Sequence, residues 1–180
     1  MGDPYFRNVQ DAVENYGIKA LDPFGTIQPL RMDSQRGLLT SGPLFDTGLI
    51  QINTGNGLYT TADAFGGKFT IAVPPVGTIS QVFFYDLDDE GISLDVVLFD
   101  ADFTATADDS AYAVTDVDHM HCIGVVSITS FTDLGGMQLG QAFPLISYSV
   151  PSGVIYAQCI IRGAPTVAAG SEPYLRFFVQ

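Results

Sequence analysis

Two histidines are the residues of this chain whose chemistry best suits catalysis or metal binding. His119 and His121 lie two positions apart, next to Asp116, Asp118 and Cys122. On a strand the two imidazoles would project from one face, and with either aspartate they would form part of a metal site. Cys122 is the one further ligand nearby, and it would point to the opposite face. We therefore expect surface histidines where a strand begins, and no zinc site.

An acidic turn is the second candidate. Asp86, Asp88 and Glu90, followed by Gly91, repeat the first half of an EF-hand calcium loop. The bidentate Glu that such a loop needs at its twelfth position is Val97, and the flanking segments are predicted strands, which excludes an EF-hand. A looser calcium site with Asp86, Asp88 and Glu90 as ligands is left open. The preferred interpretation is a hydrated turn that keeps a hairpin soluble.

Other catalytic arrangements find little support in the sequence. Paired carboxylates such as Asp108 and Asp109 can hydrolyse glycosides, but runs of neighbouring acids in loops are usually just solvated. No Gly-x-Ser-x-Gly motif is present, and the chain contains no Trp, which weakens a sugar-processing interpretation. We expect that the protein is not an enzyme, that it needs no cofactor and that it holds no catalytic metal.

Charge is unevenly distributed along the 180 residues, which contain 7 Lys and Arg against 20 Asp and Glu. Residues 1–36 carry four bases and five acids, whereas residues 37–180 carry three bases and fifteen acids. Such an acidic chain attracts neither nucleic acid nor an anionic membrane, so neither is an expected partner. The 47% hydrophobic content excludes a disordered acidic chain, and no apolar run is long enough to span a membrane. The eleven acids between residues 86 and 118 should mostly face water.

Alternation of apolar and polar residues predicts short strands throughout the second part of the chain. In the run from Ile92 to Asp100, Leu94, Val96 and Leu98 share one buried face, while Asp95 lies on a partly wet face. Seven such strands separated by turn residues predict an all-β fold, an antiparallel β-sandwich or barrel, of which we take the sandwich. The predicted strands are 68–73, 78–86, 92–100, 121–129, 144–150, 153–162 and 174–179.

Residues 1–48 are predicted to be an extended, irregular N-terminal arm, and residues 49–180 the β-sandwich domain. Residues 11–16 suit a helical turn at most, and Pro and Gly interrupt residues 21–48 repeatedly. The arm carries apolar side chains that need a surface to cover them, either on its own sandwich or on a neighbouring subunit. Cys122 and Cys159 lie in apolar runs, which favours two free buried thiols over a disulfide.

Residues 79–180 resemble the small virion structural proteins of tailed bacteriophages that decorate or cement the head. The resemblance depends on the strand Leu94–Asp100, the segment Thr106–Asp118, the hairpin Tyr156–Thr166 and the final strand Leu175–Gln180, and the arm is unmatched. It implies a jelly-roll-like sandwich without a cofactor, on the capsid exterior of the virion after synthesis in the bacterial host cytoplasm. It also implies contact with the major capsid protein and with further copies of itself, as a homotrimer in preference to a dimer.

On this interpretation the protein stabilises the capsid without catalysis, and the arm provides the main contacts. We expect these contacts with capsid or subunit to include Tyr5, Phe6, Arg7, Phe24, Arg31 and Arg36. The alternative is a head-fibre or tail module that binds a glycan on the host surface. Such a module would use Tyr112, Tyr148 and neighbouring acids, with calcium at Asp86, Asp88 and Glu90 bridging sugar hydroxyls.

Overall fold

The structure is a computed structural model that describes residues 19–21, 27–29, 31–32, 38–39, 44–55 and 57–180. The chain divides into two compact units, Met1–Pro43 and Leu44–Gln180. In the first unit β1 (Lys19–Leu21) pairs with β2 (Ile27–Pro29), and β3 (Arg31–Met32) pairs with β4 (Leu38–Leu39), both antiparallel. The turn expected at residues 11–16 lies outside the described residues.

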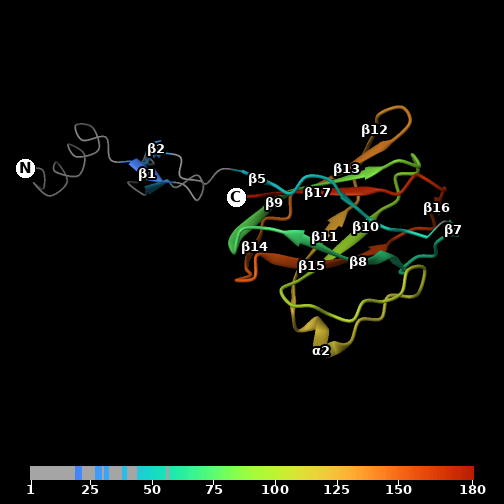
Figure 1. Cartoon of the computed structure of the whole chain (residues 1–180). Coiled ribbons are helices and arrows are strands. Elements are labelled where there is room, and N and C mark those ends of the chain that lie inside the picture. The colour runs from blue at the N-terminus through green and yellow to red at the C-terminus, as the bar shows by residue number, and fades with distance from the viewer. Residues whose placement is uncertain (1–18, 22–26, 30, 33–37, 40–43, 56) are drawn as a thin grey trace, which may run out of the picture. The chain divides into compact units, whose positions relative to one another are not determined.

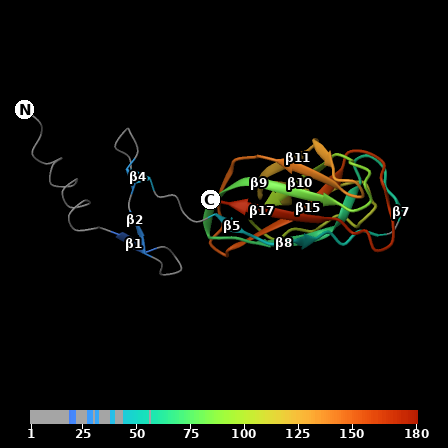
Figure 2. The same ribbon diagram turned by 90° about the horizontal axis from the view of Figure 1, so that it is seen from above.

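Two antiparallel sheets form the second unit, and Figures 1 and 2 show how their strands lie over one another. The four-stranded sheet has the order β11 (Cys122–Ile128), β10 (Leu94–Phe99), β15 (Val154–Ile161), β8 (Ala64–Ala72). The larger sheet has the order β12 (Phe131–Asp133), β13 (Gln138–Ala142), β9 (Val76–Asp86), β17 (Tyr174–Val179), β5 (Phe45–Asp46). Three shorter pairings complete the unit: β14 (Ile146–Ser149) with β9, β6 (Ile50–Gln51) with β17, and β7 (Gly57–Leu58) with β16 (Thr166–Val167). The predicted all-β, antiparallel class is confirmed.

The main hydrophobic core lies between the two sheets and follows the two-residue pleat of the strands. On β10, Leu94, Val96 and Leu98 are fully buried, as the alternation predicts. On the facing sheet, Leu175 and Phe177 of β17 are also fully buried in the same core. Strand β15 occupies a central position, between β10 and β8, which explains its apolar residues on both faces.

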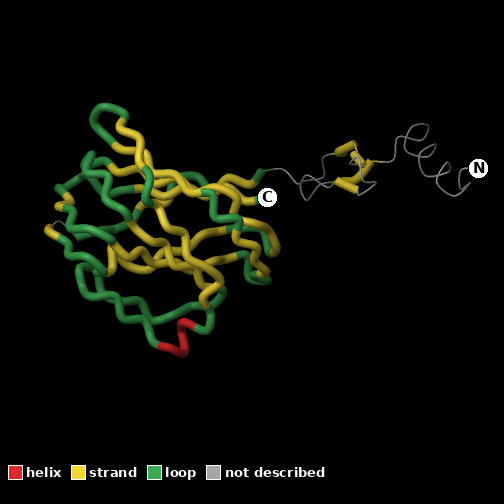
Figure 3. Tube along the Cα trace, turned by 180° about the vertical axis from the view of Figure 1, so that it is seen from behind, coloured by secondary structure: helices red, strands yellow, loops and turns green. Residues whose placement is uncertain are grey.

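A second, smaller core covers the outer face of the four-stranded sheet. The connection from β10 to β11 crosses this face and contains the short helix α2 (Asp116–His119), red in Figure 3. Phe103 from the connection stacks on Phe99 of β10 with ring centroids 4.1 Å apart, and Val97 is buried in the same cluster. The outer face of β10, which was expected to be partly exposed to water, is therefore exposed only around Asp95, because the connection covers the rest of it.

The structure differs from the predicted strands at three places. Strand β8 begins at Ala64, whereas the predicted strand began at residue 68, so Gly66 lies in a bulge within the strand. Its φ is +76°, and a Cβ there would lie 2.4 Å from Cγ2 of Ile52, so only glycine fits. Strands β12 and β13 were not predicted, and neither was the short helix α2, which ends at His119.

Candidate functional site

The acidic turn between β9 and β10 is organised by the carboxylate of Asp86. It accepts hydrogen bonds from the backbone N–H groups of Asp88 (3.1 Å), Glu90 (3.1 Å) and Gly91 (2.7 Å). Such side-chain caps are typical of aspartate in turns. Asp89 and Gly91 adopt left-handed conformations, with φ of 61° and 64°. Asp86 thus holds the turn in shape with the lone pairs that a cation would otherwise use.

The other two carboxylates of the turn reach a segment about eighty residues further along the chain. An oxygen of Glu90 accepts from the N–H of Thr166 (3.0 Å), and an oxygen of Asp88 accepts from the N–H of Ala168 (3.0 Å). Charge-assisted hydrogen bonds of this kind are among the stronger ones in proteins. Asp88 and Glu90 therefore fasten the segment around β16 to the turn.

These three carboxylates line a small pocket together with apolar side chains that include Phe65, Phe84 and Ile161. Its volume is about 20 Å³, enough for one water-sized occupant and far too small for a sugar. Within the described part of the chain, no group of three His, Cys, Asp or Glu side chains is arranged to hold a metal ion. Calcium at Asp86, Asp88 and Glu90 would compete with the backbone N–H groups already bound there, and it stays a prediction.

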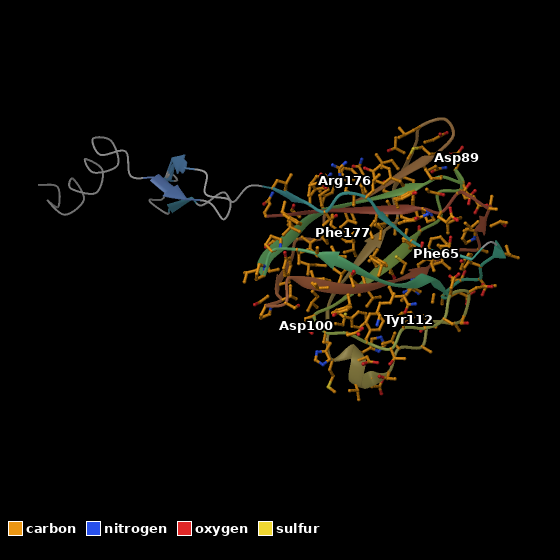
Figure 4. The ribbon with its side chains drawn as sticks, viewed as in Figure 1. Phe65, Asp89, Asp100, Tyr112, Arg176 and Phe177 are labelled. Atoms are coloured by element: carbon orange, nitrogen blue, oxygen red, sulfur yellow. The ribbon has the colours of Figure 1, made fainter. Side chains whose placement is uncertain are left out.

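The aromatic residues of the glycan-binding alternative do not join this pocket. Tyr148 is buried in the main core on β14, and Tyr112 packs against the second core. Burial raises the pKa of each phenol to about 12, so both stay protonated at neutral pH. Figure 4 shows Tyr112 beside the segment that leads to α2, and Asp89 of the acidic turn away from it.

The two histidines are exposed just before β11, as expected for surface histidines where a strand begins, but they do not share a strand face. Thr115 caps α2 by accepting the N–H of Asp118 (3.2 Å), and this capped turn winds the chain helically through His119. The His119 ring lies 6.3 Å from that of Phe99, centroid to centroid. His121 follows the helix and pairs with Asp100, with 2.9 Å between Nδ1 and Oδ1. Each imidazole therefore has its own structural neighbours.

Asp108 fastens the covering connection to the segment that leads into β8. Its carboxylate accepts from the Tyr59 hydroxyl (2.9 Å), from the N–H of Gly66 (2.7 Å) and from the N–H of Gly55. Burial, and then the hydrogen bond to Asp108, raise the pKa of Tyr59 well above its usual value. The neighbouring Asp109 side chain has no hydrogen-bond partner among the described residues. The two aspartates thus do not form a catalytic pair.

Gln158 is a polar residue that the sequence reasoning missed. It is fully buried on β15, where its amide donates to the carbonyl oxygens of Thr106 (2.7 Å) and Gly66 (3.2 Å). Its Oε1 accepts from the N–H of Thr106 (3.1 Å), so the amide is satisfied on both sides. A single Gln inside the apolar run of residues 154–161 was the available signal, because a buried amide needs partners from another segment.

Every Lys or Arg in the described second unit is paired with a carboxylate. Lys68 pairs with Asp102, and Arg162 binds Asp95 with 2.7 Å from Nε to Oδ2. Arg176 binds Asp46, with 2.8 Å from Nε to Oδ1. The Arg176 hydrogen bonds, together with the N–H of Gly48, lower the pKa of Asp46 to about 2. As expected, none of the eleven acids between residues 86 and 118 is buried, so the surface offers unpaired charge of one sign only.

A group of exposed apolar residues was also missed. Val125 of β11 lines a shallow groove of about 360 Å³ with Ser127, Gln141, Ala142 and Phe143. Phe143 remains 65% exposed, Val125 47% and the adjacent Leu145 70%. Residues 144–150 were predicted to be strand, whereas β14 begins at Ile146, which leaves Phe143 and Leu145 in a connection. The signal available in the sequence was three large apolar residues around Pro144 with no charge nearby.

Several predictions fall where the structure gives no side chains. Tyr5, Phe6, Arg7, Phe24 and Arg36 lie outside the described residues, and Arg31 is described only as part of the backbone of β3. Their role as contacts stays a prediction.

The structure shows the state of both cysteines and whether any helix among the described residues could span a membrane. Cys122 and Cys159 are both free, with Cys159 fully buried and Cys122 partly so. Burial raises the pKa of the Cys159 thiol, which keeps it protonated and unreactive. No helix in this part of the chain has the length and apolar character needed to cross a membrane.

Comparison of the chain with protein families, with curated proteins and with solved structures finds no match. The function proposed below therefore rests on the resemblance of residues 79–180 to capsid-decorating proteins, together with the fold and the side-chain geometry.

Proposed function

We propose that this chain is a structural virion protein that binds the outside of a bacteriophage capsid and stabilises it without catalysis. Its partners are the major capsid protein and further copies of itself, and it reaches the capsid exterior after synthesis in the bacterial cytoplasm. The observation that carries the proposal is that the acidic side chains bind backbone groups of their own unit. Asp86, Asp88, Glu90 and Asp108 all accept backbone N–H groups of their own unit. They fix loops in place, as a protein that acts by shape requires.

The order of the strands supports a jelly roll, the fold that the resemblance to capsid-decorating proteins implies. With β5 and β6 taken as one strand, the main strands in chain order are β5/β6, β8, β9, β10, β11, β13, β15 and β17. One sheet then has the order first, eighth, third, sixth, and the other has second, seventh, fourth, fifth. These are the pairs of one long hairpin rolled into two layers, which is how a jelly roll is built.

The charge distribution fits a protein that decorates a particle filled with nucleic acid. All three Lys and Arg residues of the second unit are paired with carboxylates, so the surface of this unit presents unpaired carboxylates to solvent. Like charge keeps densely decorated particles apart and prevents binding to released genome. Binding to a repeating lattice stabilises the shell by mass action, and no reactive group is required.

The proposal is tested on purified virions and emptied capsids of the phage whose genome carries this sequence. We expect the protein in the virions, with density outside the shell in a copy number that matches the capsid lattice. Its absence from virions would refute the proposal. Recombinant full-length protein should bind the emptied capsids, and a variant with Tyr5, Phe6 and Arg7 changed to alanine should bind at lower occupancy. A variant with the exposed Leu58 and Val76 changed to alanine is the control and should bind normally.

One observation favours the second candidate, a calcium-assisted glycan-binding module of a head fibre or tail. Asp86, Asp88 and Glu90 line one pocket, although their oxygens already accept backbone N–H groups. The module predicts binding to a glycan array in the presence of calcium, and loss of that binding with EDTA. The structural proposal predicts no glycan binding under either condition.

A further inference from the structure

We draw no further inference here: the strongest candidate, the shallow apolar groove beside the edge strand β11 with the exposed side chains of Phe143 and Leu145, carries none, because nothing among the described residues shows what covers it.

Discussion

Replacing Asp108 by asparagine tests whether this carboxylate is the anchor of the covering connection. The substitution keeps the size of the side chain but removes its charge and one of its two acceptor oxygens. The amide group that replaces this oxygen would face the N–H of Gly66 or that of Gly55, and in either orientation it would lie against the hydroxyl of Tyr59. Both Gly66 and Tyr59 are buried, so a donor that loses its partner there does not regain one from water.

The expected loss follows from the number of donors affected. A buried donor left without a partner costs about 1–3 kcal/mol, and one or two donors are affected, so Asp108→Asn should cost about 2–4 kcal/mol. For a folded unit of this size such a loss lowers the melting temperature by about 6–12 °C. Asp109→Asn is the matched control, because it makes the same change in charge one residue away. Asparagine also tolerates the left-handed φ of 57° at that position.

Thermal unfolding followed by circular dichroism measures the loss, and limited proteolysis locates it. Trypsin is uninformative, because no Lys or Arg lies between Phe69 and Ile161. Chymotrypsin can cut at Phe103 or Tyr112 in the covering connection, and Asp108→Asn should make those sites accessible before the sheets unfold. Equal melting temperatures for Asp108→Asn and wild type, or equal losses for Asp108→Asn and Asp109→Asn, would refute the assignment of Asp108 as the anchor.

Three further outcomes are expected. Phe99→Ala should lower the free energy of unfolding in urea by about 3–5 kcal/mol, because it empties the stacked centre of the second core. The folded pKa of Asp46 is about 2, below its unfolded value near 4, so its pair with Arg176 stabilises above pH 4 and is lost toward pH 2. Asp46→Asn should therefore flatten the melting temperature between pH 4 and pH 2. Calcium at 5 mM should leave the melting temperature at its EDTA value, and an increase abolished by Asp86→Asn would favour the glycan-binding module.

The long strands were predictable because their residues alternate. Leu94–Phe99 and Tyr174–Val179 both follow the two-residue pleat. The first lies within two residues of the predicted bounds 92–100, and the second matches the predicted bounds 174–179. Strand β13 (Gln138–Ala142) has two glutamines and a glycine, so its composition does not predict a strand. It is held by its pairing with β9, a contact between distant residues that local sequence does not encode. Helix α2 depends on one cap at Thr115 and is too short to give a periodic signal.

The candidate site was predictable only in its residue types. The acids of residues 86–90 were correctly placed in a turn, and Asp86 acts there through neighbours two to five positions away. The partners of Asp88 and Glu90 lie about eighty residues further on, at Ala168 and Thr166. Nothing in the local sequence marks such pairs, because the roll of the chain brings them together. The same holds for Gln158, whose partners come from β8 and from the covering connection.

The high negative charge of the second unit and the fixed conformation of its loops have the same physical origin. The connection between β10 and β11 is long, and it remains ordered over the sheet because Asp108, and Thr106 through Gln158, anchor it by hydrogen bonds. Carboxylates suit this task, since one of them accepts from several backbone donors at once. Their cost is a high negative charge, which the three Lys and Arg residues of the second unit do not offset. The capsid proposal therefore requires the acids to fix the loops of the sandwich, whereas the contacts with the capsid are expected from the arm, where residues 1–36 carry four bases against five acids.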